Sequence, residues 1–244
     1  MCKQYTHEKN IDLTILMPCL NEEENIAFCI KEAETYLASI RDRFRHTGEI
    51  LIVDNNSTDR SASIAKKCGA RVVAETRPGY GRALRTGLRK ARGSVIIFGD
   101  CDSTYDFGNL DPLYLPLSEN RADFVTGNRL GRDESGNPTM ELGAMSFSHR
   151  LGVPFLSWCG RVKFGVRITD FHCGIRGIRK DAARKCRYRT TGMEFATEMI
   201  AEAKRRDLRI GEAPVPLRVS RVKRTEKLRT VRDGFRHLLY ILRA

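Results

Sequence analysis

The chain has 244 residues, of which 41% are hydrophobic and 30% charged, a composition typical of a globular protein with a buried core. Its 43 lysines and arginines exceed its 30 aspartates and glutamates, and the resulting net charge of +13 favours polyanionic partners: nucleic acid, an anionic membrane surface or a phosphorylated substrate. No apolar run approaches the roughly 20 residues that span a bilayer, and the first residues do not resemble a signal peptide. We therefore expect neither an integral membrane protein nor a secreted one.

The eight cysteines include no C-x-x-C pair, the spacing typical of zinc ribbons and thioredoxin-like sites. His172 and Cys173 are adjacent, but no other His/Cys pair has metal-like spacing. We therefore expect free and mostly buried thiols in a reducing compartment, and no zinc.

In the first half of the chain, short apolar strands alternate with helices. The predicted strands cover residues 13–18, 49–54, 71–74, 94–99 and 122–126. The predicted helices cover 21–44, 58–68 and 79–92, the first of them with Asn21 as N-cap and Glu24 completing a capping box. Strands that are apolar on both faces and separated by helices indicate βαβ units, so we expect an α/β fold with a mostly parallel sheet.

The second half is less regular. Its predicted elements are a loop over 130–141, broken helices over 145–164, a helix from 192 to about 203, an extended edge strand over 208–219 and a final helix over 228–242. We expect a tail (1–10), one domain (11–219) with a nucleotide-binding half (11–130) and an acceptor half (131–219), and a basic amphipathic segment (220–244).

Three carboxylates follow predicted strands. Asp54 ends the second strand, and Asp100 and Asp102 follow the fourth. Parallel sheets bind ligands beyond the carboxyl ends of their strands, so these side chains are expected to line one crevice. Asp100 and Asp102 are suited to Mg²⁺ or Mn²⁺, which bind few protein ligands when phosphates supply the rest and which neutralise a diphosphate leaving group. The alternative is a solvated Asp-rich turn.

Six motifs occur in a specific order. They are MPCLNE at 17–22, VDNNSTD at 53–59, DCD at 100–102, GNR at 127–129, DFHCGIR at 170–176, and Arg221 with Lys227. In this order and spacing the chain resembles the family 2 glycosyltransferases, and within them the branch of dolichyl- or polyprenyl-phosphate sugar synthases. The resemblance covers nearly the whole chain, from about residue 11 to 242.

The resemblance implies a GT-A (Rossmann-like) fold and inverting transfer of a hexosyl group from a UDP- or GDP-sugar. The expected acceptor is a polyprenyl (undecaprenyl or dolichyl) phosphate. The resemblance also implies a role for each position that matches a motif. Contacts to the base and ribose would come from Pro18, Leu20 and Glu22, and Asp54 would accept a hydrogen bond from the base. The metal, Mg²⁺ or Mn²⁺, would be held by Asp100 and Asp102, which also contact the sugar or ribose, and the phosphates would be held by Arg129, Arg221 and Lys227. The synthases often carry a side-chain amide where this chain has Thr104, so Thr104 is left out of the metal set.

An inverting transfer needs a base opposite the leaving group. Asp170 is the first candidate for this catalytic role, alongside Asp102 at the metal, and Glu194 is the second candidate base. A phosphate acceptor is already an anion, however, and in that case Asp170 orients rather than abstracts. The structural alternatives are an Asp170 that pairs with Arg176 or caps a turn, and a Glu194 that caps its helix.

Basic residues are concentrated after residue 218, on both sides of an apolar stripe. A helix of this kind lies in a headgroup layer or packs on its own sheet, and both readings stay open. We expect a cytoplasmic protein, peripheral on the membrane face, and leave a membrane-protein partner open. The rivals are a soluble family 2 enzyme with a glycan or small-molecule acceptor, and a non-catalytic nucleotide-sugar- or nucleic-acid-binding module. Nucleic acid is not expected as a partner, because no RNP, zinc-finger or helix-turn-helix signature occurs.

Overall fold

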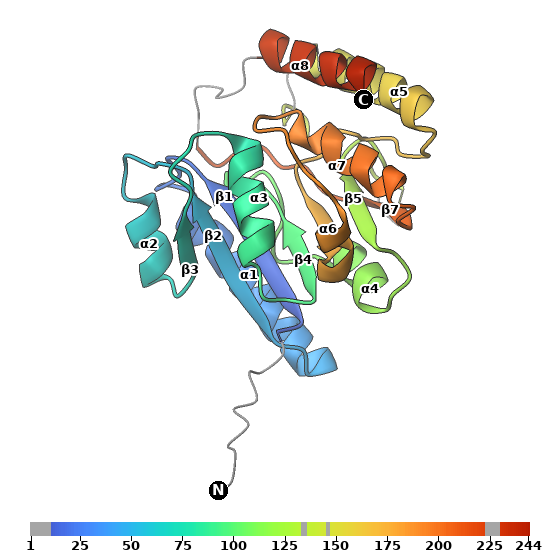
Figure 1. Cartoon of the computed structure of the whole chain (residues 1–244). Helices are drawn as coiled ribbons and strands as arrows, with labels where there is room; N and C mark the ends of the chain where they lie inside the picture. Colours follow the sequence, from blue (N-terminus) through green and yellow to red (C-terminus); the bar gives the residue numbers. More distant parts are fainter. Residues whose placement is uncertain (1–10, 133–135, 145–146, 223–229) are drawn as a thin grey trace, which may run out of the picture.

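A seven-stranded sheet lies at the centre of the computed structural model, which describes residues 11–132, 136–144, 147–222 and 230–244 (Figure 1). The strands are β1 (Leu13–Cys19), β2 (Gly48–Asp54), β3 (Arg71–Ala74), β4 (Val95–Phe98), β5 (Phe124–Asn128), β6 (Arg176–Arg179) and β7 (Ile210–Pro214). Their order is β3-β2-β1-β4-β6-β5-β7. Only β6 runs antiparallel to its neighbours in this sheet, so the predicted mostly parallel α/β fold is confirmed.

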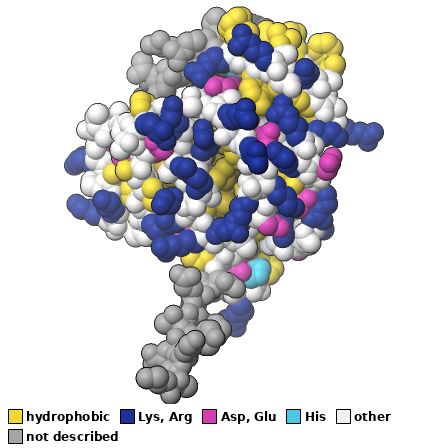
Figure 2. All heavy atoms as spheres, in the orientation of Figure 1, with side chains coloured by type: hydrophobic (Ala, Val, Ile, Leu, Met, Phe, Trp, Pro, Cys, Tyr) yellow, Lys and Arg dark blue, Asp and Glu magenta, His cyan; other side chains and the backbone are white. Residues whose placement is uncertain are grey.

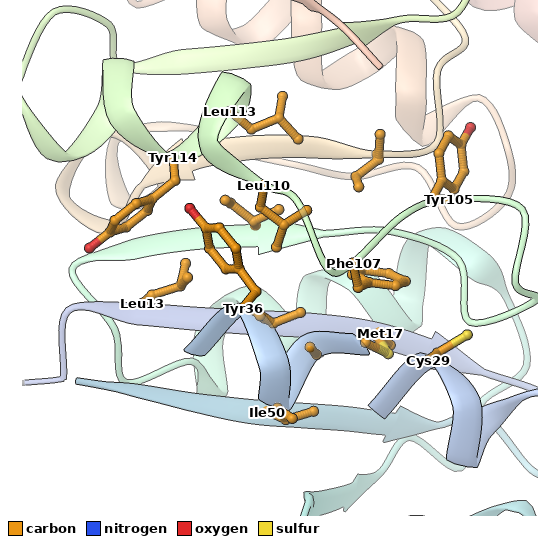
Figure 3. Close-up of a cluster of buried hydrophobic side chains, with 14 of the residues drawn as sticks. Leu13, Met17, Cys29, Tyr36, Ile50, Tyr105, Phe107, Leu110, Leu113 and Tyr114 are labelled. Carbon is orange, nitrogen blue, oxygen red and sulfur yellow. The ribbon is translucent and has the colours of Figure 1, made fainter. Parts of the chain in front are cut away.

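Helices cover both faces of the sheet. They are α1 (Ile26–Phe44), α2 (Ser61–Lys67), α3 (Tyr80–Lys90), α4 (Asp111–Ser118), α5 (Phe147–Phe164), α6 (Lys180–Lys185), α7 (Phe195–Arg205) and α8 (Thr230–Arg243). One apolar cluster joins β1 to α1 and α4, and Figure 3 shows Tyr36 and Tyr114 in it beside Leu13 and Met17. A second cluster joins the opposite face to α3 and α7. Both faces of the central strands are therefore apolar, which is why their sequences do not alternate.

The start of α1 differs from the prediction. The helix begins at Ile26, and Asn21 does not cap it. Asn21 has the left-handed φ of 53°, which asparagine tolerates better than most residues. Its Oδ1 accepts a hydrogen bond from the Thr58 backbone N at 2.7 Å. Asn21 thus ties the loop after β1 to the loop after β2, and the predicted capping box was wrong.

Three short elements, α4, β6 and α6, were not predicted, and α5 is one helix rather than broken helices. The α5 helix continues through Pro154, and its contacts with α7 and α8 compensate for the backbone hydrogen bond that proline cannot make. β7 lies at the sheet edge as expected, although the strand itself covers only Ile210–Pro214.

The C-terminal helix α8 packs against α5 and α7 (Figure 1). Residues 223–229 lie outside the described part of the chain, and Lys227, predicted to bind phosphate, is among them. In the part of the chain that the structure describes, no helix is both long enough and apolar enough to cross a membrane.

Candidate active site

The carboxylates of Asp100 and Asp102 lie in the loop that follows β4. Burial, and after it the negative charge of Asp102, raise the pKa of Asp100 to about 7, although a hydrogen bond with Tyr80 opposes the shift. Asp102 is fixed by Thr104, whose backbone N and hydroxyl donate to Oδ1 at 3.1 and 2.6 Å. Thr104 therefore orients Asp102.

Two neighbouring carboxylates, one of them with a raised pKa, form a site where a divalent cation would relieve repulsion. Among the described residues, no group of three or more His, Cys, Asp or Glu side chains is arranged to hold a metal ion. A cation at Asp100 and Asp102 would thus take its remaining ligands from a substrate and water, as Mg²⁺ and Mn²⁺ do at phosphate-binding sites.

Pro18, Leu20 and Asp54 come together at the same edge of the sheet. β1 and β2 are paired so that Pro18 lies opposite Val53 and Cys19 opposite Asp54, and Leu20 follows directly after β1. Asp54 Oδ1 accepts a hydrogen bond from the Ser57 backbone N at 3.2 Å, while Leu20 is 42% exposed. This edge of the sheet therefore carries an exposed apolar side chain and a carboxylate.

Glu22 lies deeper in the fold than the neighbouring positions and is 7% exposed. Its backbone N donates to the Ser61 hydroxyl at 2.7 Å, and its Oε2 accepts from Asn25 Nδ2 at 3.2 Å. Asn25 Oδ1 in turn accepts from the Ser103 hydroxyl at 3.2 Å. Glu22 is thus connected to the loop that carries Asp100 and Asp102.

Arg221 is brought to this loop from the far end of the chain. Its backbone N donates to the Ser103 hydroxyl at 3.1 Å, and the Ser220 hydroxyl donates to the backbone O of Asp102 at 2.9 Å. The Arg221 guanidinium lies 4.2 Å from the centre of the Phe28 ring. Arg218 anchors the segment because its backbone N donates to the Thr104 carbonyl at 2.9 Å. A positive side chain consequently lies beside the carboxylate loop.

Asp170 and Arg129 form a bidentate ion pair. Arg129 Nε donates to Asp170 Oδ2 at 2.7 Å and its terminal nitrogen donates to Oδ1 at 2.9 Å. Asp170 is fully buried. Burial alone would raise the pKa of Asp170, but the Arg129 guanidinium holds it below its usual range. Both oxygens of Asp170 are therefore engaged by Arg129.

Arg129 also lies close enough to Asp100 to lower its pKa. Its fork, however, is directed at Asp170, so it contributes positive charge to the site rather than an unoccupied pair of donors. The backbone N atoms of Thr169 and Asp170 both donate to Glu212 Oε1 at 2.8 Å, which fixes the loop that carries the ion pair.

Arg176 is not the partner of Asp170. Its buried guanidinium donates to the carbonyls of Phe171, Cys173 and Ala196 at 2.7, 2.9 and 2.5 Å. Arg176 therefore stabilises the loop between Asp170 and β6 by hydrogen bonds to its backbone carbonyls.

Glu194, the second candidate base, faces α8. Its Oε1 accepts from Arg236 at 2.7 Å and from the Gly192 backbone N at 3.2 Å. Burial would raise its pKa, but these bonds hold it below its usual value. Oε2 is buried without a hydrogen-bond partner among the described residues.

Tyr80, Tyr105 and Gly174 belong to the site but were not predicted. Tyr80 bonds Asp100, and the Tyr105 hydroxyl accepts a hydrogen bond from the Gly174 backbone N at 2.8 Å. A Cβ atom on Gly174 would lie 2.7 Å from Asp100 Oδ2, so only glycine allows this approach. Two features of the sequence could have indicated these residues: Gly174 lies in the 170–176 motif, and Tyr105 lies three residues after the D-x-D sequence. Neither feature predicts proximity to Asp100, because that proximity depends on tertiary contacts.

The domain is of the GT-A class. It combines a mostly parallel sheet with a carboxylate pair beyond β4, and the segment that carries Arg221 is bonded to the loop of that pair. Within this class the chain belongs to glycosyl transferase family 2, because the sequence model of the family "Glycosyl transferase family 2" matches residues 14–187.

Two of the curated relatives from Haloferax volcanii illustrate the similarity. The low-salt glycan biosynthesis hexosyltransferase Agl6 is 36% identical over 94% of this chain, and the chain spans only 53% of that relative's length. A dolichyl-phosphate hexose transferase is 27% identical over 88% of this chain and 85% of its own length. Among solved structures, glucosyl-3-phosphoglycerate synthase from Mycobacterium tuberculosis, crystallised with Mn²⁺, UDP-glucose and phosphoglyceric acid, has the same fold. Its TM-score is 0.73 at 19% identity, over 96% of this chain and 79% of that one.

Proposed function

We propose that this chain is an inverting glycosyltransferase that moves a hexosyl group from a UDP- or GDP-sugar to a polyprenyl phosphate. The observation that carries the proposal is the Asp100–Asp102 pair beyond β4 with Arg221 bonded across its loop. The hexosyltransferase and dolichyl-phosphate hexose transferase relatives support the hexosyl group and the lipid phosphate.

In this proposal Asp100 and Asp102 hold Mg²⁺ or Mn²⁺, and the cation supplies neutralising charge to the diphosphate leaving group. Arg221, whose backbone is bonded to the loop of these carboxylates, adds a second positive charge, with Lys227 as a further phosphate ligand. Pro18 and Leu20 cover the base, and Asp54 accepts one of its hydrogen bonds. Glu22 acts indirectly, through Asn25 and Ser103, by fixing the carboxylate loop.

The acceptor phosphate brings its own anionic oxygen. That oxygen attacks the anomeric carbon, the bond from this carbon to the diphosphate breaks, and its electron pair leaves with the nucleoside diphosphate. No side chain has to remove a proton in this step, which agrees with an Asp170 whose oxygens are both engaged by Arg129. Asp170 is then a positioning residue, because it holds Arg129 near Asp100.

The test is transfer of radiolabelled hexose from UDP- and GDP-sugars to polyprenyl phosphate with Mn²⁺ present. We expect the label in the chloroform–methanol phase and a loss of about 100-fold or more in Asp102→Ala. Asp42→Ala removes an exposed carboxylate of α1 and serves as the matched control, which should keep the parent rate.

Two outcomes contradict the proposal. If Asp102→Ala transfers hexose at the parent rate, the metal role fails. If the label from active protein remains in water with a glycan or small-molecule acceptor, the soluble family 2 enzyme is the correct reading.

A further inference from the structure

Helices α5 and α8 lie side by side at one end of the molecule (Figure 1). Their inner faces are built into the fold. On α5, the Ser157 hydroxyl accepts a hydrogen bond from the Phe171 backbone N at 3.2 Å, and Gly160 packs against the Phe171 ring. On α8, the buried His237 is bonded through Nδ1 to the Thr197 hydroxyl at 2.8 Å. One face of each helix is therefore held by the domain.

The outer faces of the same helices carry large apolar side chains in water. They are Phe155 (56% exposed), Trp158 (54%) and Val162 (68%) on α5, with Phe235 (60%) and Leu242 (66%) on α8. These five residues are named here the α5–α8 apolar face. Spacings of three, four and seven residues place the members of each helix on one side of it. Figure 2 shows hydrophobic side chains gathered over these helices, with lysine and arginine side chains among them. Apolar groups collected in this way mark an interaction surface.

Basic residues outnumber acidic ones along these two helices. The sequence of α5 contains no acidic residue, and Arg161 and Lys163 flank Val162. Arg243 follows Leu242 on α8, and the one acidic residue in the sequence of this helix is Asp233. Aromatic residues between basic ones are typical of segments that lie in the headgroup layer of an anionic membrane. Two copies of this face would bring like charges together, which disfavours self-association.

We propose that the α5–α8 apolar face docks on an anionic lipid bilayer, with Phe155 and Trp158 entering the headgroup layer and Arg161, Lys163 and Arg243 contacting lipid phosphates. The sequence offered one amphipathic helix that either packs on the domain or meets a membrane. In the structure α8 packs on the domain through its inner face. Its outer face, together with that of α5, forms the surface proposed to meet the membrane. This docking requires neither donor, metal nor transfer activity.

Trp158 is the only tryptophan of the chain, so selectively excited tryptophan fluorescence reports on this face alone. The experiment mixes the protein with vesicles of phosphatidylcholine, or of phosphatidylcholine with 30% phosphatidylglycerol, without nucleotide, metal or acceptor. We expect a blue shift of the emission with the anionic vesicles, quenching by brominated phospholipid, and weaker binding in 0.5 M salt.

The variant Phe155→Glu/Val162→Glu keeps Trp158 and should bind anionic vesicles at least about 10-fold more weakly in a sedimentation assay. Phe44→Glu alters an exposed phenylalanine of α1 and should bind like the parent. Far-UV circular dichroism checks that both variants fold. The proposal is overturned if the emission does not shift, if the double variant binds as the parent does, or if the emission is already shifted without lipid in a dimer. The last outcome would assign the face to a second copy. None of these results depends on whether hexose is transferred.

Discussion

Asp170 and Arg129 meet inside the protein through two parallel hydrogen bonds of 2.7 and 2.9 Å, with the carboxylate fully buried. The pair joins the end of β5 to the loop before β6, and the Arg129 guanidinium lies close enough to Asp100 to lower its pKa. Its geometry is that of a planar guanidinium matched to a carboxylate, which lysine cannot reproduce.

Removing the charge of Asp170 should destabilise the fold. Asp170→Asn leaves the Arg129 guanidinium buried without its counter-ion, so we expect a loss of about 3–5 kcal/mol in the free energy of unfolding, measured by urea denaturation. Glu119→Gln breaks the exposed pair with Arg121 and should cost no more than about 1 kcal/mol. If Asp170→Asn instead abolished transfer with unchanged stability, Asp170 would be the base and not a positioning residue.

A methyl group at Gly174 should disturb the proposed metal site. Because a Cβ atom there would lie 2.7 Å from Asp100 Oδ2, Gly174→Ala must displace that carboxylate. We expect Mn²⁺ with UDP or GDP to bind about 10-fold more weakly in calorimetry, since overpacking costs about 1–3 kcal/mol. Gly152→Ala is the control, because a Cβ atom at that position of α5 meets nothing within 4 Å. Equal affinities in the two variants would argue against a metal held by Asp100.

His237 should make the stability depend on pH. Burial lowers the pKa of His237 to about 4, whereas an unfolded histidine titrates near 6.5. The unfolded chain therefore gains a proton that the folded chain does not, and the stabilisation present above about pH 6.5 is lost as the pH falls toward 4.

The loss amounts to at most about 3 kcal/mol for this group. Urea denaturation at several pH values between 7 and 4 should give a shallower dependence for His237→Gln than for the parent. The groups near His237 are Thr197, Glu194, Arg176, Arg236 and His172. The pKa of His172 is lowered by burial as well. Identical slopes for variant and parent would show that His237 already carries its proton in the fold.

The cysteine thiols should fall into two classes by their rate of alkylation. Cys19, Cys29, Cys101 and Cys173 are buried, whereas Cys68, Cys159 and Cys186 are only partly covered, and all seven of these described cysteines are free. Burial raises the pKa of Cys29 and of Cys173 to about 12, so both are protonated near neutral pH. Because the reagent reaches the partly covered thiols more readily, iodoacetamide at pH 7.5 should modify the second class first, as read by mass spectrometry of peptides. A peptide pair linked through two cysteines in unreduced protein would contradict the assignment.

The alternating first half of the chain could be predicted because each strand there is a continuous apolar run between helical patterns. The same local signals did not predict β6, because this strand has only four residues and one of them is a buried arginine. The Arg176 guanidinium is buried because it donates hydrogen bonds to three backbone carbonyls, and these come from other segments. The local signals failed for Asn21 too, because its side chain bonds the loop after β2 instead of its own helix.

The sequence by itself determined the mostly parallel sheet and the position of Asp54, Asp100 and Asp102 at strand ends, because strand periodicity and the direction of the chain are local properties. Only the tertiary structure decided which groups meet those carboxylates. It paired Asp170 with Arg129 rather than Arg176, folded Arg221 across the Asp102 loop, and divided α8 between an inner and an outer face. Partners of this kind depend on the pairing of strands and on contacts between distant segments, and spacing along the chain carries no information about either.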